Sequence, residues 1–187
     1  LAQSDDISIS TVVPINNELF EEVTDIDGNI YKSVLFGNKK WFAQNLKVTH
    51  YRNGDKIPTD FRKFEWRRFH ITKIGAYATY NDDPGNADLC GYLYNFYTIK
   101  DDRGVCPEGW HVPTDKEWME LEIYLGMNKN KVKSSGLRGT NEGSQLASNN
   151  ELWQFGELVN ETEFGTSGFN ALPCGYREAD NGEYLRS

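Results

Sequence analysis

The stretch CPEGWHVPTDKEWMELEIYLG, from Cys106 to Gly126, combines residue types that could do chemistry. A cysteine can act as a nucleophile, a histidine as a base and a carboxylate as an acid. A base needs an oriented partner, however, and a thiol needs an activating neighbour. Cys106 lies directly before Pro107 in a constrained turn, and His111 lies between two apolar residues. We therefore expect a disulfide role for Cys106 and a structural hydrogen bond for His111.

The remaining polar residues of this stretch predict a helix with a defined start and end. The sequence Thr114-Asp115-Lys116-Glu117 fits a capping box, in which the threonine and glutamate side chains each bond the other's backbone N–H. Pro113 ends the preceding strand, and Gly126 is suited to the C-terminal cap. We expect a helix over 113–126 with one buried stripe, formed by Trp118, Leu121 and Leu125.

The sequence offers one candidate for a metal site. His50 and His70 show no metal-ligand spacing with the cysteines. The segment NDDPGNAD, residues 81–88, is dense in oxygen ligands that could hold Ca²⁺. Its spacing does not fit the EF-hand pattern, and its proline and glycine are typical of a plain turn. The candidate calcium ligands are Asp82, Asp83 and Asp88.

A basic, aromatic segment, FRKFEWRRFH over residues 61–70, stands out on this acidic chain. The segment contains four basic residues and one acidic residue, with aromatic residues interspersed among them. One hypothesis is a platform for sugars or polyanions, through ring stacking and arginine hydrogen bonds. The alternative is an amphipathic surface segment whose rings lie in the core. The candidate ligand-binding residues are Arg62, Trp66 and Arg67, together with Trp153 from a later loop.

The elements that position these residues are mostly short strands and turns. Residues 1–22 are weakly patterned and are expected to be a tether, with one short strand around 7–13. Two turn signals, Asp27-Gly28 and Gly37-Asn38, predict a three-strand meander beginning at residue 23. Further along we expect a loop-rich region over 52–75, a strand over 76–80, a buried segment over 91–99, a long connection over 127–167 with a short helix at 143–148, an apolar strand over 168–173, and a hairpin turn at 180–182.

Composition limits the class of protein. The 187 residues suit a single domain, and 17 glycines with 13% aromatic residues favour short strands and turns over a helical bundle. No apolar run approaches the roughly 20 residues of a transmembrane helix. The formal net charge of −8 argues against nucleic acid as a partner, because phosphate binding needs a positive surface. The absence of an initiator methionine suggests a processed or trimmed start.

Four blocks of the sequence together resemble the Fibrobacter succinogenes major paralogous domain. They are DIDGNIYKSVLFGNKKWFAQNLKV, GYLYNFYTI, CPEGWHVPTDKEWMELEIYLG and GTSGFNALPCGYR, in the family's order. The resemblance implies an α+β domain over 23–187 of C-type-lectin-like architecture, similar to formylglycine-generating enzymes: a compact domain with a twisted antiparallel sheet, one or two helices and long loops. It also implies a secreted or outer-membrane surface-anchored protein.

The sequence departs from the family pattern in three places. The chain ends before the family's final strand, which suggests a C-terminal truncation, an open sheet edge able to accept an added strand, and a missing partner for Cys106. Cys90 and Cys174 stand where relatives commonly lack cysteine, which suggests a bridge between them and an oxidising compartment. The segment over 61–70 resembles an insertion or a diverged loop.

Two functions are compatible with these features, and a third fits them poorly. We favour a non-catalytic, extracytoplasmic binding or adhesion module for a glycan or a surface protein, with no cofactor apart from the possible Ca²⁺. The alternative is a structural or assembly component of the bacterial surface. Catalysis of the formylglycine-generating kind needs a close cysteine pair near the C-terminal end of the domain, where Cys174 stands alone.

Overall fold

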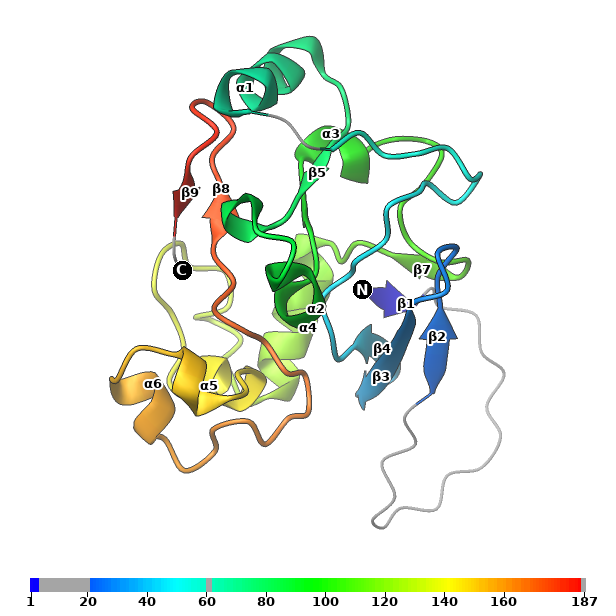
Figure 1. Cartoon of the computed structure of the whole chain (residues 1–187). Coiled ribbons are helices and arrows are strands. Elements are labelled where there is room, and N and C mark those ends of the chain that lie inside the picture. Colours follow the sequence, from blue (N-terminus) through cyan, green and yellow to red (C-terminus); the bar gives the residue numbers. More distant parts are fainter. Residues whose placement is uncertain (4–20, 60–61, 186–187) are drawn as a thin grey trace. The chain divides into compact units, whose positions relative to one another are not determined.

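The computed structural model describes residues 1–3, 21–59 and 62–185 (Figure 1). The chain divides into two units that are interleaved along the sequence. Unit 1 comprises Leu1–Val23, Tyr31–Ala43 and Gly109–Asn170, and unit 2 comprises Thr24–Ile30, Gln44–Glu108 and Ala171–Ser187. The strand expected around residues 7–13 lies outside the described residues. Helices and antiparallel strand pairs occur together, so the protein is of the α+β class.

A five-stranded sheet forms the frame of unit 1 and confirms the predicted meander (Figure 1). The tight turn at Gly37-Asn38 joins two strands in a register that pairs Val34 with Trp41. Glycine suits this turn because residue 37 has a φ of +64°. Among the described residues, the first and last strands of the sheet order have a neighbour on one side only. The order is β2 (Glu22–Thr24), β3 (Ile30–Phe36), β4 (Lys39–Phe42), β1 (Ala2–Gln3) and β7 (Trp110–His111).

Strand β3 buries side chains on both of its faces. Tyr31 and Ser33 are buried on one face, and Phe36 is buried on the other, while Leu35 is exposed. Tyr31 stacks on Phe42, with ring centroids 4.8 Å apart. A strand covered on both sides does not show a simple alternation of buried and exposed residues. The buried residues of β3 therefore come from both faces of the strand.

Helix α4 (Asp115–Tyr124) closes the core of unit 1 and has the predicted capping box. The Thr114 hydroxyl accepts a hydrogen bond from the Glu117 N–H, and the Glu117 carboxylate accepts one from the Thr114 N–H at 2.8 Å. Leu121 is buried, and Trp118 packs 5.0 Å from Trp41 between ring centroids. The core members are Ala2, Phe36, Trp41 and Leu121, with Val34, Trp118, Leu125, Leu146 and Phe169 packed against them.

The long connection of unit 1 contains short helices. Helix α5 (Glu142–Leu146) confirms the short helix predicted near residue 143. It is followed by the 3-10 helix η2 (Asn150–Leu152) and by α6 (Glu157–Asn160). The apolar strand predicted over 168–173 was wrong, because this segment is irregular. Phe169 packs into the core, so its apolar character reflects burial and not strand pairing.

Unit 2 is built from small elements around two strand pairs. The region over 52–75 was predicted to be loop-rich, but it contains the ten-residue helix α1. The segment over 91–99 was predicted to be buried, but the Phe96 side chain within it is 61% exposed. The predicted hairpin at 180–182 is confirmed. None of the helices in the described part of the chain is long and apolar enough to span a membrane. The elements are α1 (Lys63–Thr72), β5 (Tyr77–Ala78), η1 (Tyr80–Asp82), α2 (Asn86–Cys90), β6 (Leu93–Tyr94), α3 (Phe96–Ile99), β8 (Tyr176–Arg177) and β9 (Tyr184–Leu185).

Candidate functional site

Helix α1 carries two of the four predicted ligand-binding residues, Trp66 and Arg67, and begins directly after a third, Arg62. Its start is fixed by Glu65, whose carboxylate accepts a hydrogen bond from the Arg62 N–H at 3.0 Å. Its end is fixed by Lys73, which adopts a left-handed conformation with a φ of +59° and bonds the Phe69 carbonyl. No proline or glycine interrupts the segment between these caps. Local signals therefore favour a helix here, which places successive side chains on different faces.

Trp66 lies on the inner face of α1 and is only 4% exposed. It packs in a core cluster with Ala76 and Ala78 of the same unit. The guanidinium of Arg177 lies 4.5 Å from the centre of its ring. The hypothesis that Trp66 offers its ring to a sugar was wrong for this structure, because the ring is covered.

Arg177 joins α1 to the C-terminal hairpin of unit 2. Its guanidinium lies 4.7 Å from the Tyr184 ring and 3.5 Å from the Asp82 carboxylate, and its Nε donates to the Gly182 carbonyl at 3.2 Å. The Tyr184 hydroxyl donates to Asp82. Burial, followed by this bond, raises the pKa of Tyr184 above its ordinary value. A planar arginine suits such a site because it packs on rings and still satisfies its donors.

The outer face of α1 presents a different set of side chains. Phe64 and Ile71 are each 66% exposed, and Arg67 and Arg68 between them are also exposed. These four residues occupy positions i, i+3, i+4 and i+7, which share one face of a helix. An exposed face that combines apolar and arginine side chains has the composition typical of binding surfaces. We call these four residues the α1 outer face.

Aromatic residues continue near the C-terminal end of α1. His70 lies 6.0 Å from Tyr97 between ring centroids, and Tyr97 lies 5.6 Å from Phe96. The Lys100 ammonium lies 5.9 Å from the centre of the Phe96 ring. Sequence reasoning missed Phe96 because an apolar run predicted burial. The sequence signal that could have predicted the exposure of Phe96 is Asn95. Its side chain accepts a hydrogen bond from the Thr98 N–H at 3.0 Å and so caps the start of helix α3.

The other predicted residues are placed apart from this face. Arg62 is exposed next to the start of α1, whereas Trp153 belongs to unit 1. Trp153 is half-buried, and its indole N–H donates to the Ser148 carbonyl at 2.8 Å. The α1 outer face therefore contains Arg67 but not Trp66 or Trp153.

The three candidate calcium ligands are each engaged separately. Asp82 accepts from Tyr184, and Asp83 accepts from the Gly85 N–H at 2.9 Å. Asp88 forms an ion pair with Lys47 at 3.1 Å. Within the described ranges, no group of three or more histidine, cysteine or acidic side chains has an arrangement that could hold a metal ion. The structure thus does not bring these carboxylates together as a ligand set.

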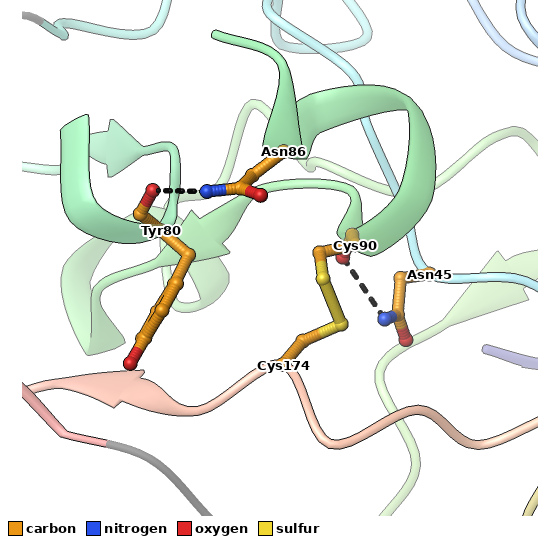
Figure 2. Close-up of a disulfide and its surroundings, with 5 residues drawn as sticks. All are labelled: Asn45, Tyr80, Asn86, Cys90 and Cys174. Carbon is orange, nitrogen blue, oxygen red and sulfur yellow. Dashed lines mark hydrogen bonds between the residues drawn. A yellow bond between two sulfur atoms is a disulfide. The ribbon is translucent and has the colours of Figure 1, made fainter. Parts of the chain in front are cut away.

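A disulfide joins Cys90 to Cys174, the pair that the resemblance suggested (Figure 2). It ties α2 to the segment before β8, with Cα atoms 5.6 Å apart. The Asn45 side chain donates to the Cys90 carbonyl at 2.9 Å. Gly91 follows with a φ of +66°, and a Cβ there would lie 2.6 Å from the Leu46 carbonyl oxygen. Only glycine fits this position without displacing the backbone.

Cys106 is the one cysteine outside that disulfide, and its thiol is buried. Burial raises its pKa to about 11. A thiol with such a pKa is almost wholly protonated at neutral pH and is a weak nucleophile. The proposed disulfide partner of Cys106 in a longer chain stays a prediction.

The acid–base residues of the opening stretch are used in the helix cap. His111 Nε2 lies 2.9 Å from both carboxylate oxygens of Glu117, and Lys39 Nζ lies 3.0 Å from Oε1. Burial alone would raise the pKa of Glu117, but hydrogen bonds from Thr114, His111 and Lys39 outweigh it and lower the pKa to about 2. The predicted structural hydrogen bond of His111 is confirmed.

A second histidine–carboxylate pair lies in unit 2. His50 Nδ1 lies 2.5 Å from Oδ1 of Asp27, and Oδ2 of Asp27 accepts from the Thr49 N–H and hydroxyl. Burial acts to raise the pKa of Asp27, and the bonds from Thr49 and His50 lower it below its ordinary value. These contacts fasten the Asp27 turn to residues 49–50 and account for both groups structurally.

Comparison with known families gives one match. The family model of the Fibrobacter succinogenes major domain matches residues 34–186. The chain belongs to this family. The match runs from within β3 to the end of the C-terminal hairpin and includes α1, α4 and both bridged cysteines. Searches of the curated proteins and of the solved structures gave no match. The C-type-lectin-like architecture of this Fibrobacter succinogenes major domain stays a prediction.

Proposed function

We propose that this protein is a non-catalytic, extracytoplasmic binding or adhesion module for glycans. The observation that carries the proposal is the α1 outer face, where Phe64 and Ile71 are each 66% exposed beside Arg67 and Arg68. Exposed rings and aliphatic groups pack on the apolar faces of sugar rings, while guanidinium groups donate to their oxygens. The nearby aromatic pair Phe96 and Tyr97 extends the same chemistry.

The non-catalytic part of the proposal is supported by the state of the groups that could do chemistry. His111 and Glu117 bond each other in the cap of α4, His50 and Asp27 bond each other in a turn, and Cys106 is buried with a raised pKa. A nucleophile needs access to substrate, which burial denies the Cys106 thiol.

The extracytoplasmic location is supported by the disulfide. Structural disulfides persist in oxidising compartments and are rare in the reducing cytosol. The Cys90–Cys174 bridge connects residues 84 positions apart. Disulfide formation in the periplasm or medium, checked by thiol alkylation of protein taken directly from the native host, tests this location.

The binding proposal is tested by screening the purified protein against a glycan array and insoluble polysaccharides. Phe64→Ala/Ile71→Ala is the test variant. Leu137→Ala/Phe155→Ala is the matched control, because these two side chains of unit 1 are also highly exposed. We expect saturable binding that the test variant loses and the control keeps. Absence of binding by the folded protein, or equal binding by both variants, would contradict the proposal.

A second candidate, assembly at the cell surface, is favoured by the sheet edges of unit 1. Strands β2 and β7 lie at the two ends of the described sheet. Such edges can accept a strand from another chain. Concentration-dependent oligomers by light scattering, abolished by Val23→Pro in β2, would support this function over the first.

A further inference from the structure

The charge of α1 is opposite to that of the rest of the chain. From Arg62 to Lys73 there are five basic residues and one acid, a net charge of +4. The whole chain carries −8, so the remaining residues carry −12. An anionic ligand is therefore repelled by the protein in general and attracted to this helix.

The two arginines of the α1 outer face differ from the arginines that hold the fold together. Arg103, Arg138 and Arg177 each pair with carboxylates, at 3.0, 2.9 and 3.5 Å. Arg67 and Arg68 form no ion pair within the part of the chain that the structure describes. Because these two guanidinium groups form no ion pair among the described residues, their hydrogen-bond donors can serve a ligand. A planar guanidinium group can bind a carboxylate with two parallel hydrogen bonds.

We propose that the α1 outer face binds an acidic polysaccharide through the carboxylates of its uronic acid residues. Arg67 and Arg68 pair with the carboxylates, and Phe64 and Ile71 pack against the sugar rings on either side. This inference rests on the proposed glycan-binding function and specifies its ligand class.

The dimensions of the face favour a polysaccharide over a protein partner. From Phe64 to Ile71 the helix rises about 10 Å, the length of a short segment of sugar chain. A stable protein interface buries roughly 800 Å² on each partner, which four side chains on one helix do not supply. A linear polymer can also bind along a narrow strip and avoid the acidic surroundings.

The test compares polygalacturonate with its fully methyl-esterified form, which keeps the sugar backbone and removes the charge. Binding is measured by isothermal titration with the wild-type protein and with Arg67→Gln/Arg68→Gln. The matched control is Lys131→Gln/Lys133→Gln, which removes two exposed positive charges from unit 1. Circular dichroism and thermal unfolding establish that each variant is folded. Duplex DNA and phosphatidylserine vesicles serve as other anionic probes.

We expect binding of polygalacturonate that weakens as salt rises, falls about tenfold or more in the arginine variant and is unchanged in the control. The esterified polymer is expected to bind much more weakly. Equal binding of the two polymers, unaffected by the arginine variant, would overturn the acidic class and leave glycan binding standing. Arginine-dependent binding of DNA or vesicles that is tighter than the binding of polygalacturonate would overturn the acidic-polysaccharide proposal in favour of another anion. Absence of binding to any glycan would overturn both proposals.

Discussion

The guanidinium of Arg177 lies 4.5 Å from the centre of the Trp66 ring, and the Arg177 side chain is only 1% exposed. This relationship joins the C-terminal hairpin to the inner face of α1. It also fixes which way the helix faces, because a buried Trp66 leaves Phe64, Arg67 and Arg68 on the outside. The same contact therefore stabilises unit 2 and presents the candidate binding residues.

Replacement of Arg177 by alanine is expected to reduce the free energy of unfolding by about 2–4 kcal/mol. The variant loses packing on two rings, the bond to the Gly182 carbonyl and the pair with Asp82. Arg177→Lys keeps the charge but loses the planar contact with the rings, so its free energy of unfolding should lie between those of the wild type and Arg177→Ala. Urea denaturation measures the series, and an unchanged midpoint for Arg177→Ala would refute the role assigned to this residue.

The disulfide is expected to make a large contribution to stability. A crosslink between residues 84 positions apart contributes about 4–5 kcal/mol in the chain-entropy model. We expect Cys90→Ser/Cys174→Ser to lower the unfolding midpoint strongly in denaturant. A non-reduced digest should yield a linked peptide containing Cys90 and Cys174 and an alkylated Cys106. A digest in which Cys106 is linked to either of the other two would contradict the assigned pairing.

Glu117 predicts a specific dependence of stability on pH. Its pKa in the folded protein, about 2, lies below the ordinary value of 4.5. A carboxylate with a lowered pKa stabilises the fold above the unfolded pKa, and this contribution is lost as the pH falls from about 4.5 toward 2. We expect about 2 kcal/mol of such loss, absent in Glu117→Gln. Thermal unfolding measured across this pH range tests the prediction, and Asp115→Asn, at an exposed position, is the control. Curves of stability against pH that run parallel for Glu117→Gln and the wild type would contradict the prediction.

His111→Ala is expected to lower stability by about 1–1.5 kcal/mol, since the histidine bonds the buried Glu117 carboxylate. Ligand binding should be unchanged, because His111 belongs to unit 1 and the α1 outer face to unit 2. The two readouts are urea denaturation and glycan titration. A variant of normal stability that has lost binding would place a function at His111.

Local signals predicted the elements that are specified within a few residues. The capping box from Thr114 to Glu117 defined the start of α4, and the turn at Gly37-Asn38 defined a hairpin. Each depends on hydrogen bonds between neighbouring residues, so each can be inferred without knowledge of the rest of the chain.

Burial depended on partners far along the chain and was harder to predict. The sequence left open whether Trp66 faces solvent or the core, and the contacts that cover it come from Arg177 and Tyr184, at the other end of the sequence. Phe96 was expected inside and lies outside, because its four-residue helix turns it away from the core. The proposed site lies on the segment that the sequence singled out, but only Arg67 of the four residues named for it lies on the α1 outer face.

The central claim is that ligand binds on the α1 outer face, and nuclear magnetic resonance tests it most directly. Amide shifts of labelled protein are followed while a glycan found in the screen is titrated. We predict that the perturbed amides gather at Lys63–Thr72 and around Phe96, with residues of unit 1 unaffected. Perturbations confined to unit 1, for example around Trp153, would contradict the claim and move the binding site to the other unit.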